Sequence, residues 1–303
     1  MEIESVQSYL TLINRLQEKY LYIIPPEGKN PIFRPKLFPS KFIYRGHSNH
    51  KKYKLSPSIF RWKQTSGGSY TSEYSQLEYT ILFDFMSEAC GFIKDIPSQN
   101  TIAWLEIARH YGVPTRLLDF TNNPLVALYF ACAGSPGSDA SVWIINETAY
   151  KRVFYDVNEG FPISPLPSDT VITKIVNDEI VLQNYQSHSD SQLYFQYPWI
   201  YKPFYRDDRM TTQSSVFMLW GADRAELTSF MHPEFYMVDL DEPTNVETGV
   251  LCFVRIHSDK KQDLLKQLDM CGINEKMIYP GLDGIGRYIA EKYSSSRASI
   301  KQR

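Results

Sequence analysis

Hydrophobic residues recur at helical spacing in several separate stretches of the chain. This spacing predicts amphipathic or buried helices over residues 4–20, 72–93 and 259–270. A further helix is expected to close the chain after the turn at Pro280 and Gly281. The pattern therefore places helices near both ends of the chain and on either side of its centre.

Short apolar runs alternate with these helices and predict strands. They cover residues 42–44, ending at Arg45 and Gly46, then 141–145, a run entered at Gln213, 251–256, and a short run after Glu275. We expect an α+β fold, a single domain with a mixed or antiparallel split sheet flanked by helices. Residues 146–207 are the least regular part and are interpreted as strands and loops. Their aromatic-rich part, 185–205, is interpreted as packing or as a surface for a base or peptide.

The stretch from residue 105 to 133 has the clearest local signals. Gly112 is expected to end a helix and Pro114 to prevent its continuation. A short buried strand and a polar corner at 119–123 follow, and Asn123 is the natural N-cap of an apolar helix starting at Pro124. Polar side chains between two apolar elements must be hydrogen-bonded or functional. Both interpretations stay open for this corner.

Composition narrows the class of protein. With 303 residues, 43% hydrophobic residues and a net charge of −2, the chain can build a core and shows no global preference for nucleic acid or an anionic membrane. The four cysteines show no C-x-x-C spacing, and the acidic start lacks the features of a signal peptide. We expect a cytoplasmic protein without membrane spans. Its parts are a helix and Pro-rich lead-in over 1–40, a domain over 41–293 and a frayed tail over 294–303.

Several kinds of site lack their sequence signals. The histidines are not paired at metal-ligand spacing, so no metal site is expected. The sequence also has no G-x-S-x-G elbow and no P-loop. The polar landmarks expected at strand ends are Arg45, the 119–123 corner and Glu275. An arginine can hold a phosphate with two hydrogen bonds, and a glutamate can accept from a ribose hydroxyl. Arg45 paired with Asp119 or Glu275 as a structural ion pair is the alternative.

Five segments together resemble the FRG domain family, which is named for a Phe-Arg-Gly motif. They are YRGHSN, YKLSPSIFR, ARHYGVPTRLLDFTNNPLVALYFA, RMTTQSSVF and GINEKMIYPGLDGI, and they extend from about Lys41 to Tyr288. Tyr44 replaces the phenylalanine of the family's motif. The bacterial setting of the family implies a toxin or a phage-defence effector.

The chain also resembles, more weakly, the Arg-Ser-Glu class of ADP-ribosyltransferases. This resemblance implies that NAD is a substrate, that Arg45 anchors its phosphates and that Thr121 braces the site. It also implies that Glu275 stabilises the cationic ribose as nicotinamide leaves. Thr121 lacks the class's Ser-Thr-Ser pattern, and Ile273 stands where arginine-modifying members carry a second acid. The acceptor is therefore a protein side chain, a nucleic-acid base or water.

We expect Arg45, Thr121 and Glu275 to line one concave site as its catalytic residues. The residues expected to contact NAD are Arg45, Gly46, His110, Tyr111, Arg116, Asp119 and Asn122. The leading hypothesis is an NAD-consuming, ADP-ribosyltransferase-like enzyme. The alternative is a non-catalytic nucleotide- or nucleic-acid-binding module that uses the same cleft.

Overall fold

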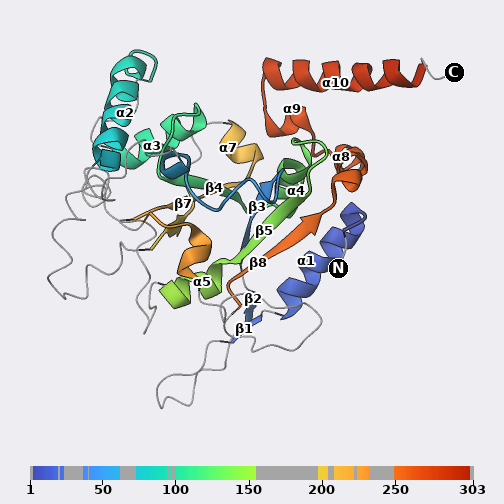
Figure 1. Ribbon diagram of the computed structural model, residues 1–303, viewed down its shortest axis with the longest axis horizontal. Helices are drawn as coiled ribbons and strands as arrows, with labels where there is room; N and C mark the ends of the chain where they lie inside the picture. Colours follow the sequence, from blue (N-terminus) through green and yellow to red (C-terminus); the bar gives the residue numbers. More distant parts are fainter. Residues whose placement is uncertain are drawn as a thin grey trace.

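The computed structural model shows helices packed on both faces of a central sheet (Figure 1). It describes residues 3–19, 21–23, 37–39, 41–61, 73–93, 96, 100–154, 197–203, 208–221, 224–231 and 249–300. Among these residues, no helix is both long and apolar enough to cross a membrane.

Within the described part of the chain, the central sheet has six strands, and every neighbouring pair is antiparallel. The strands are β3 (Phe42–His47), β4 (Leu117–Thr121), β5 (Ala140–Asn146), β6 (Trp199–Tyr201), β7 (Ser215–Leu219) and β8 (Leu251–Ile256), in the order β6-β7-β4-β3-β5-β8. The short strands β1 (Leu21–Ile23) and β2 (Leu37–Pro39) pair separately. The expected α+β fold with an antiparallel sheet and flanking helices is confirmed.

The two middle strands of this sheet barely pair with each other. β3 and β4 share a single register pair, Tyr44 with Thr121, whereas β3 and β5 share six and β4 and β7 share five. Beyond that pair, the Nη1 group of Arg45 donates to the backbone carbonyl of Asp119. A side chain thus bridges two strands where backbone pairing has stopped, and polar groups gather in the middle of the sheet.

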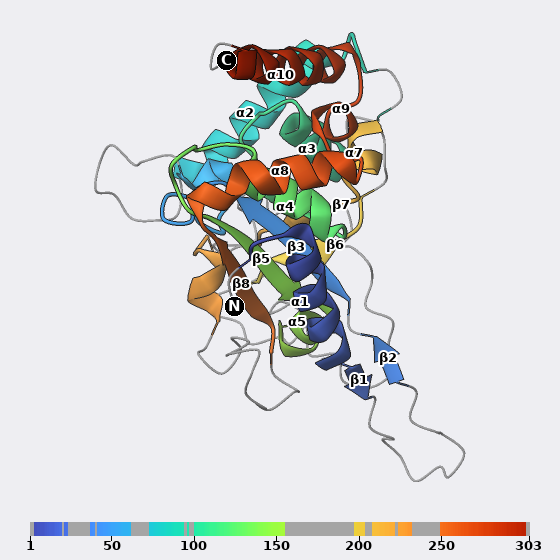
Figure 2. The ribbon, with the colours of Figure 1, turned by 90° about the vertical axis from the view of Figure 1, so that its right-hand side faces the viewer.

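The helices α1 (Val6–Lys19), α4 (Pro124–Cys132) and α8 (Lys261–Met270) cover one face of the sheet (Figure 2). The helix α4 is buried between the sheet and the other two helices, which explains why it is apolar nearly all round. Asn123 caps it as predicted, because its side-chain oxygen accepts from the Leu125 N–H at 2.9 Å.

Gly46 allows β3 to approach α4 closely. A Cβ atom added at Gly46 would collide with the Ala127 carbonyl oxygen and the Ala131 nitrogen. Gly46 is one of the residues expected to contact NAD. Its close neighbour is the α4 backbone, so its first requirement is helix packing.

The opposite face packs against α2 (Glu73–Ala89), α3 (Thr101–His110) and α5 (Glu147–Phe154). Asn100 caps the start of α3 by accepting from Ala103 N–H at 3.2 Å. Gly112 ends α3 as predicted, with a φ of 83°, a conformation that favours glycine. The start and the end of α3 are therefore both defined by local signals, and its last turn carries Arg109 and His110.

The remaining helices are short or lie toward the C-terminus. They are α7 (Asp208–Thr212), α9 (Glu275–Ile278), α10 (Leu282–Ile300) and short 3-10 helices at Ser58–Arg61, Leu227–Phe230 and Ser258–Lys260. The helix α10 reaches into the stretch expected to fray, and the proposed domain limits stay predictions.

Three local predictions were wrong. Glu275 starts the helix α9 instead of preceding a strand, because Asn274 accepts from Met277 N–H at 3.2 Å and caps a helical turn. Asn146 similarly caps α5, which replaces the strands and loops expected there, by accepting from Ala149 N–H at 3.0 Å. Arg45 lies within β3, which continues to His47.

The structure describes residues 197–203 of the aromatic-rich region 185–205. Trp199 and Tyr201 are buried in the core, as the packing interpretation predicts. Residues 185–196 and 204–205 lie outside the described residues.

Candidate functional site

A cavity of about 740 Å³ lies where β3 and β4 stop pairing. Its volume is within the range typical of small-molecule sites. Side chains from β3, α3, β4, α4, α7 and β7 line it. The described lining residues are Tyr44, Arg45, Gly46, His47, Ser48, Tyr53, Arg61, Arg109, His110, Tyr111, Gly112, Asp119, Phe120, Thr121, Ala127, Phe130, Arg209, Met210, Gln213, Ser215 and Phe217.

The lining is strongly imbalanced in charge. Four arginines, at positions 45, 61, 109 and 209, face a single carboxylate among the described lining residues, that of Asp119. The whole chain, by contrast, has a net charge of −2. Positive charge is thus concentrated around a cavity that could enclose a ligand.

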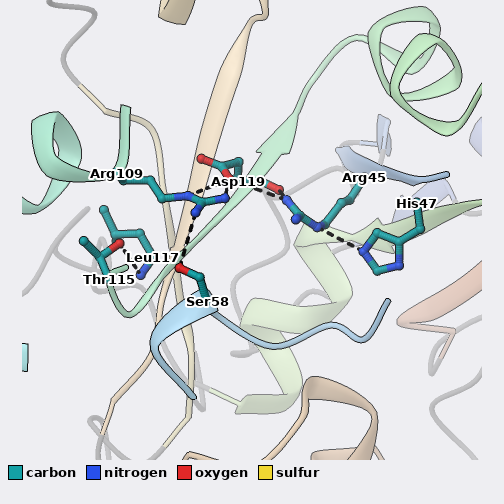
Figure 3. Close-up of polar contacts among 7 residues, drawn as sticks. All are labelled: Arg45, His47, Ser58, Arg109, Thr115, Leu117 and Asp119. Atoms are coloured by element: carbon teal, nitrogen blue, oxygen red, sulfur yellow. Dashed lines mark hydrogen bonds and ion pairs between the residues drawn. The ribbon is translucent and has the colours of Figure 1, made fainter. Parts of the chain in front are cut away.

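Asp119 joins two of these arginines (Figure 3). Its Oδ2 atom accepts from Arg109 Nε at 2.9 Å and from Arg109 Nη2 at 2.5 Å, and lies 3.7 Å from Arg45 Nη1. Burial by itself would raise the pKa of Asp119, but Arg109 and then Arg45 outweigh it and the pKa is lowered. Asp119 therefore stays ionised near neutral pH, and its side chain is 40% exposed.

The positive charge of Arg45 is less well balanced by its neighbours than the negative charge of Asp119. Burial lowers the pKa of Arg45 to about 10, Asp119 opposes this change, and the neighbouring charges of Arg109 and Arg61 lower the pKa further. Arg45 remains a cation at neutral pH, but its environment is short of negative charge. An anionic ligand would relieve this shortage.

His47 supports Arg45 as a neutral ring. Arg45 Nε donates to His47 Nε2 at 3.2 Å, so the ring proton is assigned to Nδ1. Burial, followed by the charges of Arg45 and Arg61, lowers the pKa of His47 to about 3. His47 therefore orients a guanidinium group without adding a charge.

The other arginines come from separate elements. Arg109 occupies the last turn of α3 and donates through Nη1 to Ser58 Oγ at 3.4 Å. Arg61 ends the short helix that starts at Ser58, and Arg209 lies in α7. Within the described part of the chain, no ion pair is formed by Arg61 or Arg209. These two guanidinium groups are therefore the least neutralised.

Aromatic rings form another part of the lining. Tyr111 is 70% exposed and lies edge-on to His110, with ring centroids 5.0 Å apart. Both border the cavity, as the sequence predicted, together with Phe130 and Phe217. The exposed Tyr111 ring offers a stacking surface for a planar group.

Two residues of the predicted corner serve local structure. The Thr121 hydroxyl donates to the Gln213 carbonyl at 2.6 Å and accepts from the Asn123 N–H at 3.0 Å. Thr121 lines the cavity, but its hydroxyl is occupied by backbone groups. Asn122 is exposed and is not among the lining residues; its N–H donates to the Ser214 carbonyl at 3.0 Å.

Arg116 lies away from the cavity. It is buried with Glu78 of α2, and its Nε and Nη2 atoms donate to Glu78 Oε2 at 2.7 and 2.5 Å. The Arg116 N–H also donates to Glu78 Oε1, and Arg116 Nη1 donates to the Gly221 carbonyl. With its hydrogen bonds directed to these partners, Arg116 is placed for structural pairing and not for ligand contact.

Glu275 also lies outside the cavity lining. Its Oε2 atom accepts from the Tyr129 hydroxyl, and its Oε1 atom accepts from Arg287 Nε at 2.5 Å. The structure therefore brings Arg45 and Thr121 to one cavity but leaves Glu275 out of it. The predicted concave site of all three residues is wrong in this respect.

Sequence reasoning missed Arg109, Arg209 and His47 as lining residues. Each stands in or beside a segment that resembles the FRG family, so a signal was present. Its meaning depended on tertiary contacts, because the three residues come from different elements.

Comparison with protein families supports the resemblance noted in the sequence. Residues 40–140 match the family model of the FRG domain. This span includes β3, the short helix Ser58–Arg61, α3 and β4, which supply Arg45, Arg61, Arg109 and Asp119 in that order. No curated protein and no solved structure matches the chain.

Proposed function

We propose that this FRG-domain protein binds a nucleotide through its phosphates in the arginine-lined cavity, with NAD as the candidate ligand. The observation that carries the proposal is the ratio of four arginines to one carboxylate in the described lining. Arg109 and Arg45 share Asp119, so Arg61 and Arg209 are left to meet an anion. A guanidinium group can bind phosphate oxygens with two hydrogen bonds.

The remaining lining suits the other parts of a nucleotide. Tyr111 presents an exposed ring that can stack on a base or on nicotinamide. Asp119 can accept a hydrogen bond from a ribose hydroxyl, because one of its oxygens, Oδ2, takes the Arg109 bonds and the side chain remains 40% exposed. Phosphate, ribose and ring thus each find a complementary group.

Calorimetric titration of the whole protein tests this proposal. NAD, ADP-ribose and inorganic pyrophosphate should all bind, and their affinities should fall as salt is raised, because charge drives the contact. Nicotinamide riboside lacks the pyrophosphate and should bind more weakly. Absence of binding by all three phosphate ligands would overturn the proposal.

ADP-ribosyltransferase-like cleavage of NAD is the second candidate function. In that reaction the bond from ribose to nicotinamide breaks, its electron pair leaves with nicotinamide, and an acceptor then attacks the ribose. A carboxylate helps by stabilising the developing positive charge. The observation favouring this candidate is the ionised Asp119 in the cavity lining, and the proposal gives Asp119 the role that the sequence assigned to Glu275.

Measuring nicotinamide release separates binding from cleavage. Asp119→Asn removes a negative charge beside the arginines, so NAD affinity should be kept or increased. If Asp119 stabilises the ribose cation, turnover should fall by about two to three orders of magnitude, typical of losing one electrostatic group. A parent protein that binds NAD and releases no nicotinamide would leave binding as the function and exclude cleavage.

A further inference from the structure

Tyr279 lies between the cavity and the C-terminal helix. The guanidinium carbon of Arg209 is 4.7 Å from the Tyr279 ring centroid, and that of Arg287 is 4.9 Å from it. Arg209 lines the cavity, whereas Arg287 belongs to α10 and does not. One ring therefore contacts a cavity cation and a cation outside it.

Arg287 is neutralised locally and Arg209 is not. The hydrogen bond to Glu275, at 2.5 Å, raises the pKa of Arg287. Glu275 also accepts from Tyr129 of α4, which fixes the start of α9 against the body of the domain. In the described part of the chain, the Arg209 guanidinium has no carboxylate partner and lies over the Tyr279 ring.

Other contacts tie α9 to the cavity wall. Gln213 Nε2 donates to the Ile278 carbonyl at 3.0 Å, and Phe130 lies edge-on to Tyr279 with ring centroids 6.5 Å apart. Gln213 and Phe130 both line the cavity. The residues around Tyr279 thus form the outer support of the wall that carries Arg209.

We propose that Tyr279 is a positioning residue that orients Arg209 toward the phosphates of the ligand, and that Glu275 supports it through Arg287. A long arginine side chain loses rotamer freedom on binding, and holding it in place beforehand lowers that cost. An aromatic ring can hold a guanidinium group without neutralising it. This inference rests on the proposed phosphate-binding function and assigns Glu275 a role outside the cavity.

Substitutions at Tyr279 distinguish orientation from general packing. Tyr279→Phe keeps the ring face and should bind inorganic pyrophosphate and NAD as the parent does, within about twofold. Tyr279→Leu keeps an apolar side chain but removes the ring, and its affinity should fall by about threefold to tenfold, the scale of one ordered side chain. When Arg209→Met is combined with each of these variants, Tyr279→Phe and Tyr279→Leu should have the same affinity, because the ring acts through Arg209.

Glu275→Gln is the second variant, should Tyr279→Leu fail to fold. It should weaken pyrophosphate binding by a few-fold, whereas a glutamate acting in catalysis would leave binding unchanged. Calorimetric titration decides between these outcomes. If the parent binds pyrophosphate or NAD and both Tyr279→Leu and Glu275→Gln bind equally well, this inference is overturned alone. If the parent binds neither ligand, the proposed function is overturned, and the inference with it.

Discussion

Two arginines of the same stretch, Arg109 and Arg116, have opposite surroundings. Arg116 and Glu78 form a one-to-one pair with side chains 2% exposed, and the Arg116 guanidinium donates to the Glu78 carboxylate and to the Gly221 carbonyl. Arg109 shares the carboxylate of Asp119 with Arg45 beside an open cavity. The first arrangement is electrostatically complete, whereas the second has surplus positive charge.

The comparison shows what separates a structural arginine from a candidate ligand-binding one. A fully buried charge is tolerated only when it is paired and hydrogen-bonded, so Arg116 has no capacity left for a ligand. The cluster around Asp119 is partly exposed and unbalanced, so it can accept a further anion. Charge balance, more than residue type, therefore distinguishes the two regions.

Breaking the buried pair should have the largest effect. Arg116→Met leaves the Glu78 carboxylate buried without its partner, which should lower the free energy of unfolding by about 3–5 kcal/mol. Urea denaturation measures this loss. The double variant Glu78→Leu with Arg116→Met should recover most of it, because an apolar pair replaces the ion pair. A loss below about 1 kcal/mol in the single variant would contradict the structural role.

Removing a cavity arginine should affect binding instead of folding. Arg61→Gln removes an exposed guanidinium, so stability should change by no more than about 0.5 kcal/mol. NAD affinity should fall by about tenfold to a hundredfold, since hydrogen bonds to charged groups contribute about 1.5–3 kcal/mol. Arg15→Gln, an exposed arginine on α1, is the matched control. Equal losses of NAD affinity in both variants would show that the net charge of the protein, and not the position of Arg61, determines binding.

Substituting His47 should give the smallest effect, a change in how the free energy of unfolding depends on pH. Its pKa is lowered to about 3 in the folded protein, against an ordinary 6.5, so the unfolded chain takes up the proton first as pH falls. Protonation of His47 in the unfolded chain therefore lowers the free energy of unfolding as the pH falls, by roughly 0.7 kcal/mol between pH 7 and 6. His47→Gln cannot titrate, and the fall in its unfolding free energy should be shallower by that amount. Parallel curves for parent and variant would contradict the lowered pKa.

The parts of the fold that sequence predicted well depend on local signals. Gly112 and Asn123 bound their helices as expected, because capping and a left-handed turn involve neighbouring residues. Asn274 carried the same kind of signal, but the helix that it caps has only four residues, Glu275–Ile278. Its apolar pattern was too short to separate a strand from one helical turn.

The candidate site was predicted less well because charge balance is a tertiary property. Asp119 pairs with Arg109 and Arg45, whereas Arg116, between α3 and β4, pairs with Glu78 of α2. Nothing in the local sequence around the arginines reports which of them has a carboxylate within reach. Glu275 was likewise placed by motif order alone, and its contacts with Tyr129 and Arg287 keep it out of the cavity lining.

The most direct test is a calorimetric titration of NAD into the parent protein and into the double variant Arg61→Gln with Arg209→Gln. This variant removes the two cavity guanidinium groups that have no ion pair among the described residues, and it leaves Asp119 with both of its arginines. The parent should bind NAD with an affinity that weakens as salt is raised, and the folded double variant should show no measurable binding. A parent that does not bind NAD, or a double variant that binds it as tightly as the parent, would contradict a phosphate-binding role for this cavity.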